Sequence, residues 1–241
     1  MENEISKHTL KIIKTMHDPK ITLKKKIGEV ALEIFIIVFA VSLAQFLERQ
    51  KEQSVKQKDV KEFLIGIKED IQRDIQDTRD NIEAYKHYSK VYTYLSELKP
   101  SSNPIPDTLN KYFHEASSNS FLRPNTSRYE GFKSSGKLED IEDKKLLHQI
   151  LDYYQETLAR IHTSELSYID KGNKLLDVFI DQVIENDDGT NNYEKIILEP
   201  KCKNLCKTLI PRAQLFERYN NVIAAGNSII RRINDLYPKN K

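Results

Sequence analysis

The pattern of apolar and polar residues divides the chain into one long apolar run followed by several amphipathic segments. Residues 34–47 read IFIIVFAVSLAQFL without a charged side chain, and the apolar run extends back to residue 27. A helix needs about 20 residues to cross the hydrocarbon core of a bilayer. The run therefore predicts a transmembrane helix over residues 27–47, preceded by a short basic cytoplasmic segment, residues 1–26.

Two other interpretations of the apolar run stay open. Ser42 and Ala44 are small residues at the positions that a signal-peptide cleavage site requires, although the 33 residues before residue 34 are long for such a peptide. A buried core helix of a soluble protein would also be apolar around its circumference. The polar character of the rest of the chain favours the membrane helix over both alternatives.

Charge beside the run bears on its orientation. Lys24, Lys25 and Lys26 precede it, and the cytoplasmic flanks of membrane helices are enriched in Lys and Arg. Basic residues also follow the run, so charge only favours a cytoplasmic N-terminus with the C-terminal domain outside the cytoplasm. Glu29 and Glu33 lie one helical turn apart near its start. The membrane interface is the favoured position for them, and a partner within the membrane is the alternative that stays open.

Beyond the run, the spacing of apolar residues predicts that the same helix continues. Residues 48–99 contain no proline, and apolar side chains recur every three or four positions from Val60 to Leu95. This near-heptad stripe needs partners that bury it. A proline-rich stretch at residues 100–106 ends the helix, and Asp107 is expected to cap a short helix after it.

The rest of the chain predicts two more long helices. Residues 117–136 are rich in Ser, Asn and Gly and read as a loop. Helical periodicity follows over residues 138–185 and again over residues 201–237, where Pro211 bends or breaks the helix. We therefore predict an all-α fold, in which the transmembrane helix continues into an elongated extracytoplasmic bundle of three to four long helices, residues 48–241.

Composition agrees with a helical domain that carries no strong net charge. Charged residues make up 31% of the chain, only seven residues are glycine, and tryptophan is absent. Residues 48–241 hold 31 basic and 31 acidic side chains. We therefore expect no nucleic-acid partner, because nucleic-acid-binding domains present an excess of positive charge.

A short series of motifs lies in the middle of the chain. They are Tyr129, the turn Ser134, Ser135 and Gly136, the apolar step from Leu138 to Ile141, and the pair Tyr153 and Tyr154. With the run Lys26, Ile27, Gly28, Glu29 and Val30, this pattern resembles an uncharacterised family of bacterial (Bacteroidetes-type) single-pass membrane proteins. The family usually has an Asn-Trp pair after the anchor, where this chain has Phe46 and Leu47.

The resemblance covers most of residues 24–160. It implies a protein of the bacterial inner membrane with a cytoplasmic N-terminus and an extracytoplasmic helical domain. It implies no activity, because the family has none to transfer.

One motif mimics a phosphate-binding loop. The segment from Gly131 to Lys137 matches the G-x-x-x-x-G-K skeleton, but Leu138 stands where the loop needs a Ser or Thr to bind Mg²⁺. No apolar strand precedes it. We interpret Gly136 as a turn glycine instead, with Ser134 or Ser135 helping to cap the next helix.

Cys202 and Cys206 are the only two cysteines. Their spacing is not the C-x-x-C redox pattern, and without matched histidines they make a poor zinc site. A local disulfide, which an oxidising compartment would favour, and free core thiols both stay open. Beyond this pair we expect no catalytic residue, no metal site and no cofactor, and hence a protein that is not an enzyme.

The apolar stripe leads to a hypothesis of function. A C-terminal helix broken near Pro211 is too short to cover the whole stripe, so we predict that the side chains nearest the membrane form an interface. These side chains are Val60, Leu64, Ile67 and Ile71. The expected function is a membrane-anchored module that acts by protein association, as a homo-oligomer or with another membrane protein. The alternative is an extracytoplasmic sensor of an unknown small-molecule ligand, signalling through a partner membrane protein.

Overall fold

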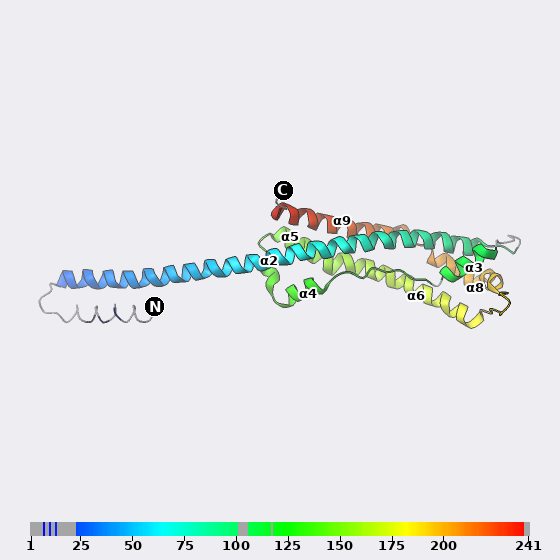
Figure 1. Ribbon diagram of the computed structural model, residues 1–241, viewed down its shortest axis with the longest axis horizontal. Coiled ribbons are helices and arrows are strands. Elements are labelled where there is room, and N and C mark those ends of the chain that lie inside the picture. Colours follow the sequence, from blue (N-terminus) through cyan, green and yellow to red (C-terminus); the bar gives the residue numbers. More distant parts are fainter. Residues whose placement is uncertain are drawn as a thin grey trace. The chain divides into compact units, whose positions relative to one another are not determined.

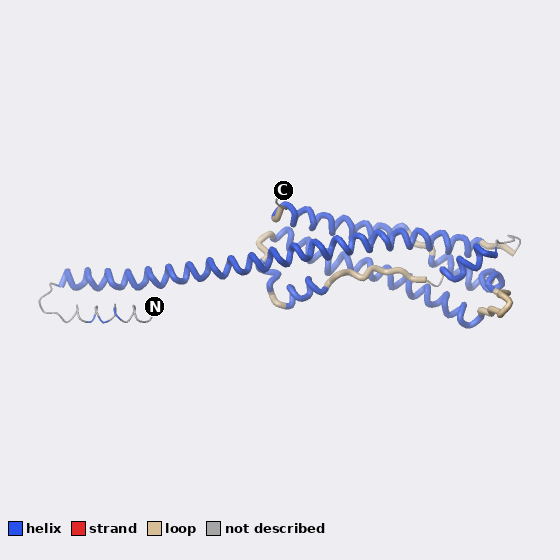
Figure 2. The backbone as a smooth tube through the Cα atoms, viewed as in Figure 1, coloured by secondary structure: helices blue, strands red, loops and turns tan. Residues whose placement is uncertain are grey.

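The structure is a computed structural model that describes residues 7, 10, 13, 23–100, 106–116 and 118–238. The chain divides into two units, Met1–Asp59 and Val60–Lys241, so residues 48–59 fall in the first unit. The described residues form helices, and their only β-type contact is an isolated bridge between Glu185 and Asn191 (Figure 2). The prediction of an all-α fold is confirmed.

Helix α2 (Leu23–Glu97) contains both of the apolar patterns found in the sequence. It is long and apolar enough near its N-terminal end to cross a membrane. Because no proline occurs within it, every residue beyond its first turn can donate its backbone N–H to a carbonyl of the preceding turn. The prediction that the helix continues past the apolar run is confirmed.

The second unit continues from α2 through α3 (Pro106–Glu115), an extended segment and α4 (Ser127–Ser134) (Figure 1). Two predictions are wrong here. Helix α4 occupies residues that we read as loop, because Tyr129 is buried and anchors one side of this short helix. Asp107 lies inside the first turn of α3 and is not its cap, since the helix already begins at Pro106.

The second long helix begins later than predicted. A short 3₁₀ helix, η1 (Lys137–Asp140), and an extended Ile141 come before α5 (Lys144–Leu151). Asp143 is the cap of α5, and its carboxylate accepts a hydrogen bond from the backbone N–H of Leu146 at 3.0 Å.

The serines of the predicted turn do not cap the next helix. The Ser134 hydroxyl donates to the Gly131 carbonyl at 3.0 Å, and the Ser135 hydroxyl donates to the Phe132 carbonyl at 2.8 Å. Both therefore close the end of α4. Gly136 has φ 73°, a left-handed conformation that favours glycine, so its interpretation as a turn glycine is confirmed.

Helix α5 passes through one π-helical turn, η2 (Asp152–Thr157), into α6 (Leu158–Gln182). The adjacent residues Tyr153 and Tyr154 are both buried, and the next buried residue is Leu158. The wider turn holds one more residue than an α-helical turn, so the buried face of α5 and that of α6 stay aligned. The sequence pattern of residues 138–185 gave no separate signal for this insertion.

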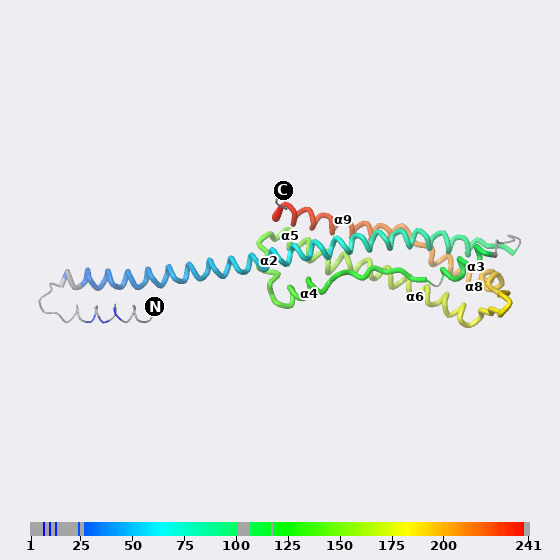
Figure 3. Tube along the Cα trace, in the orientation of Figure 1, coloured from blue at the N-terminus to red at the C-terminus, as the bar shows by residue number. Residues whose placement is uncertain are grey.

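Three more helices follow in the second unit: α7 (Tyr193–Leu198), α8 (Pro200–Leu209) and the long helix α9 (Ala213–Leu236). Pro200 begins α8, and the predicted break near Pro211 separates α8 from α9. In the second unit, α9 runs back beside α2 and α5 (Figures 1 and 3). Gly226 of α9 lets the two long helices approach, because a Cβ there would lie 2.8 Å from Ile71 and 3.0 Å from Ile75.

Two buried clusters form the core of this unit. The first joins α2 from Val60 onward with α5, η2, the start of α6 and α9. The second joins the end of α2 with α3, the end of α6, α7 and α8. Each amphipathic stripe is thus buried against other helices of the same unit.

The interface prediction made from the stripe is wrong. Val60, Leu64, Ile67 and Ile71 are at most 2% exposed and belong to the first cluster. The expectation assumed that α9 was too short, but the same cluster also contains buried side chains of α5 and η2. These four side chains are therefore held by the chain itself and offer no surface to a partner.

Candidate functional site

A row of polar side chains lies along α2 beside its apolar stripe. Asp70, Asp74 and Asn81 are 5%, 0% and 7% exposed, and they recur at helical spacing on one side of the helix. Buried carboxylates and carboxamides need hydrogen-bond partners. Asp70 pairs with Arg73 of α2 and Arg128 of α4, whereas Asp74 and Asn81 find partners in one irregular segment of the same chain.

That segment, residues 118–126, is called the strap here and runs extended between α3 and α4 (Figures 2 and 3). At one end Ser120 donates its hydroxyl to the Asn81 side chain at 2.6 Å, and Tyr85 donates to the Ser120 carbonyl at 3.0 Å. At the other end Asn125 donates its backbone N–H and its carboxamide to one oxygen of Asp74, at 2.9 and 2.7 Å. The strap therefore binds α2 at both ends.

The middle of the strap is bound by α6. The backbone N–H of Leu122 donates to the Glu165 carboxylate at 2.8 Å, and Tyr219 of α9 donates to the same oxygen at 2.6 Å. Glu165 is 1% exposed, and its second oxygen has no hydrogen-bond partner among the described residues. One carboxylate thus joins the strap, α6 and α9.

Two glycines make room for side chains at the two ends of this region. A Cβ on Gly172 of α6 would lie 3.0 Å from the Asn119 side chain. A Cβ on Gly66 of α2 would overlap the guanidinium of Arg128, which donates to Asp70 at 3.0 Å. Close contacts of this kind need glycine on the opposing helix.

The burial of the two carboxyl groups changes their acidity. Burial raises the pKa of Asp74 above its ordinary value, although hydrogen bonds from Asn125 and Tyr153 act in the opposite direction. Burial likewise raises the pKa of Glu165, against hydrogen bonds from Tyr219 and Leu122. Desolvation penalises the charged form of each group more than its neutral hydrogen-bond donors compensate.

The structure brings the predicted signature residues together. Tyr129 of α4 stacks on Tyr154 of η2, with ring centroids 4.3 Å apart and planes inclined by 4°. Tyr153 donates a long hydrogen bond of 3.4 Å to Asp74, and Ile141 lies in the first cluster. The signature residues thus hold α4 and η2 against the end of the strap.

Cys202 and Cys206 are free thiols on α8, and both are fully buried in the second cluster. The disulfide that the sequence left open is therefore not formed here. A hydrogen bond with Cys202, together with burial, raises the pKa of the Cys206 thiol. This pair packs as part of the core.

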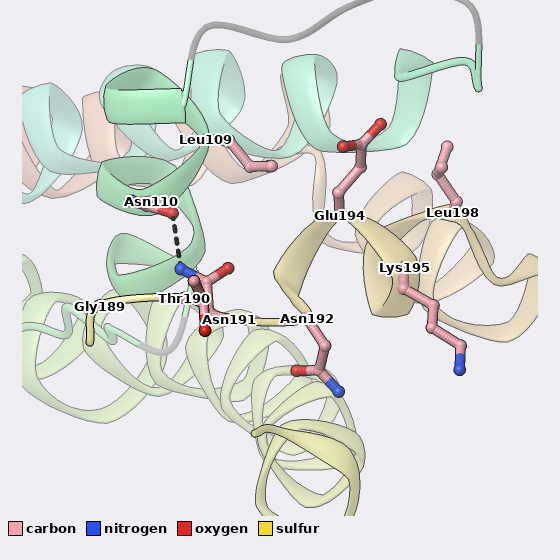
Figure 4. A pocket seen from close by; sticks show the side chains of 9 residues that line it. All are labelled: Leu109, Asn110, Gly189, Thr190, Asn191, Asn192, Glu194, Lys195 and Leu198. Carbon is pink, nitrogen blue, oxygen red and sulfur yellow. Dashed lines mark hydrogen bonds between the residues drawn. The ribbon is translucent and has the colours of Figure 1, made fainter. Parts of the chain in front are cut away.

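A shallow pocket of about 680 Å³ lies between α3, the turn before α7, and α7 itself (Figure 4). Its lining residues are Leu109, Asn110, Gly189, Thr190, Asn191, Asn192, Glu194, Lys195 and Leu198. Asn191 donates to the Asn110 side chain across it at 3.3 Å. The pocket combines carboxamides with one acidic and one basic side chain, so it carries no net charge.

Neither the polar row on α2 nor this pocket was predicted from the sequence. In the sequence, Asp70 and Asp74 are two of the many charged residues beside the apolar stripe. Their separation by four residues places them on one side of α2. The strap lies within residues 117–136, which the sequence predicts to be a loop. Among the described residues, no three His, Cys, Asp or Glu side chains gather as a metal site.

The comparisons with known proteins add no relative. The chain matches no protein-family model, no curated protein and no solved structure. The function proposed below therefore rests on the geometry of the described residues.

Proposed function

We propose that this protein is a single-pass membrane protein whose helical domain acts by association with other proteins. The observation that carries the proposal is helix α2, which contains an apolar segment of membrane-spanning length and the central stripe of the bundle. In this proposal the N-terminus is cytoplasmic, the bundle is extracytoplasmic, and the membrane is the bacterial inner membrane, as the family resemblance implies.

The distribution of exposed apolar side chains supports an anchor that contacts lipid or another membrane helix. Leu32, Phe35 and Phe39 are 59%, 65% and 58% exposed, whereas the stripe further along α2 is buried. A helix in a bilayer can leave such side chains toward lipid or pack them against a second helix. Association would therefore use the anchor or the outer surface of the bundle, and not the closed stripe.

The proposal is tested by crosslinking the full-length chain in native membranes and isolating it through a C-terminal tag. A reproducible crosslinked species, either a dimer of this chain or a complex with one membrane protein, is the expected result. A matched variant replaces residues 27–47 with an unrelated apolar span of equal length. The proposal is wrong if the full-length chain yields only the monomer under conditions that crosslink a known membrane complex in the same sample.

Orientation is tested separately with reporter fusions. Alkaline phosphatase fused after Lys241 is expected to be active, because this enzyme folds only outside the cytoplasm. A fusion after Lys26 is the matched control and should be inactive. An inactive C-terminal fusion would overturn the orientation, and a mature protein shortened by about 44 residues would show a cleaved signal peptide instead of an anchor.

A second function, the sensing of a small polar ligand, is favoured by the pocket between α3 and α7. Its carboxamides both donate and accept hydrogen bonds, as recognition of an uncharged polar molecule requires. Screening the full-length protein against sugars and neutral amino acids by thermal shift tests this candidate. Ligand-dependent stabilisation that Asn110→Ala removes supports it, and the absence of any such shift contradicts it.

A further inference from the structure

The strap joins two buried carboxyl groups that have no direct role in the apolar core. It contacts Asp74 of α2 through Asn125 and contacts Glu165 of α6 through Leu122. We propose that the strap is a proton-controlled latch, held closed while Asp74 and Glu165 are protonated and loosened when both are charged.

The hydrogen-bond partners of both carboxyl groups are neutral. Asp74 accepts from Asn125 and from the hydroxyl of Tyr153, and Glu165 accepts from a backbone N–H and the hydroxyl of Tyr219. Neutral donors offset only part of the cost of burying a charge. Ionisation of either group therefore weakens the closed arrangement, whereas a protonated carboxyl can occupy the same site at lower cost.

The charged and titratable groups that surround Asp74 and Glu165 come from α2, the strap, α4, η2, α6 and α9. They are Asp70, Arg73, Asp77 and Tyr85 of α2, Arg123 of the strap, Arg128 of α4, Tyr153 and Tyr154 of η2, His162 of α6, and Tyr219 of α9. Arg73 and Arg128 pair with Asp70, and Arg123 lies over the ring of Phe121. None of these three cations is bound to Asp74 or Glu165.

The second oxygen of Glu165 adds a separate argument from geometry. It is buried and has no hydrogen-bond partner among the described residues. A buried unpartnered oxygen is costly when it carries charge, and protonation removes that charge. The other oxygen of the Glu165 carboxylate accepts the hydrogen bond from the backbone N–H of Leu122 in the strap. Protonation of Glu165 and closure of the strap are therefore linked at one group.

The direction of the effect follows from the raised pKa of both groups. The closed strap binds protons more tightly than the open strap, in which the two carboxyls are hydrated and titrate near their ordinary values of 3.8 and 4.5. Closure is therefore most stable below those values. Closure loses stability as pH rises through the pKa that each group has in the closed state.

Hydrogen exchange of the full-length protein in detergent micelles tests the latch. Protection factors of the strap amides, corrected for the intrinsic pH dependence of exchange, are measured between pH 4 and pH 8. We expect protection in the strap to be lost as pH rises through the pKa that each group has in the closed state, because the closed strap then holds buried charge. Amides of α8, whose buried side chains belong to the second cluster, are the internal control and should not follow the same transition.

Matched variants separate the latch from a general loss of structure. Asp74→Asn combined with Glu165→Gln keeps the shape of both side chains without charge, and strap protection in this double variant should not depend on pH. Asp143→Asn, which removes a carboxylate from the α5 cap, should leave the pH dependence of the strap unchanged. The latch is refuted if the double variant retains the wild-type transition.

A second measurement covers the case in which the double variant does not fold. The protonation of Asp74 and Glu165 is followed in the wild-type protein by carboxyl carbon NMR, with assignment from the single variants. The midpoint of at least one carboxyl must coincide with the loss of strap protection. Strap protection that does not change with pH, or that changes at a midpoint shared with neither carboxyl, overturns the proposal.

Discussion

Two parts of helix α2 both carry large apolar side chains, but these side chains are exposed in one part and buried in the other. In the first part Phe35 is 65% and Phe39 is 58% exposed, whereas in the second part Leu64 is 1% and Ile67 is 0% exposed. The backbone is helical through both. Apolar content alone therefore indicates only that these side chains favour burial away from water. The neighbouring sequence decides whether other parts of the protein or a surrounding apolar phase cover them.

The polar residues of the two parts explain this difference. The second part carries Asp70, Asp74 and Asn81, each satisfied by the strap or by a side chain near it. Hydrocarbon offers no hydrogen bonds, so a helix face with these three residues is excluded from the bilayer core. Residues 34–47 carry no charged side chain and impose no such requirement.

The largest expected effect comes from placing a charge in each part of α2. Ile67→Glu should cost more than about 4 kcal/mol and unfold the bundle, because the charge would be buried without a partner. Phe39→Asp should leave the bundle folded but cost roughly 2.5–3.5 kcal/mol of membrane insertion. Circular dichroism measures the first effect, and membrane fractionation measures the second.

These two variants also provide the control for each other. If Ile67→Glu leaves thermal unfolding unchanged, the buried stripe described for the second part of α2 is wrong. If Phe39→Asp unfolds the bundle while membrane association is unaffected, the first part is a core helix and not an anchor.

The next effect concerns the close approach of α9 to the second part of α2. Gly226→Val should destabilise the bundle by about 1–3 kcal/mol, because its side chain would overlap Ile71 and Ile75. Gly131→Ala is the matched control, since a Cβ there meets no atom within 4 Å. The control should be neutral or slightly stabilising in thermal denaturation, and equal melting temperatures for both variants would contradict this packing.

A smaller effect is expected at the turn that leads from α4 toward α5. Gly136 has φ 73°, and a residue with a side chain pays about 1–2 kcal/mol for that conformation. Gly136→Val should therefore lower the melting temperature of the full-length protein. Since nothing lies within 4 Å of a Cβ at this position, a steric clash would not account for the loss. A wild-type melting curve would show that the turn relaxes without cost.

The smallest effect is a pH dependence opposite in sign to that of the strap. Arg232 donates two hydrogen bonds to Asp143, at 2.6 and 2.8 Å, and these bonds lower the pKa of Asp143. The resulting stability is present above the ordinary value of 3.8 and is lost as pH falls through the lowered pKa. Asp143→Asn should remove this acid-dependent loss in melting temperature, and an unchanged acid limb would exclude the pair as its source.

Much of the fold was predictable because helix periodicity and proline positions are local properties. The continuous helix through residue 97, the break near Pro211 and the turn at Gly136 all followed from such signals. The helix over residues 127–134 did not, because Tyr129 is placed by its stacking on Tyr154, and that contact joins distant positions. The interface assigned to Val60 and Leu64 failed for the same reason, since they are buried in a cluster that joins α2 with residues far along the chain.

Residue order alone predicts that this protein is helical, that α2 is continuous, and that its N-terminal part is apolar enough to span a membrane. Local hydrogen bonding, apolar periodicity and the rigid φ of proline act over a few residues, so the order of residues reveals them. The tertiary structure alone shows which stripe is covered and that Asp74 and Glu165 bind one end and the middle of the strap. Those contacts join residues separated by 43 and 51 positions, and their strength depends on burial that no local pattern specifies.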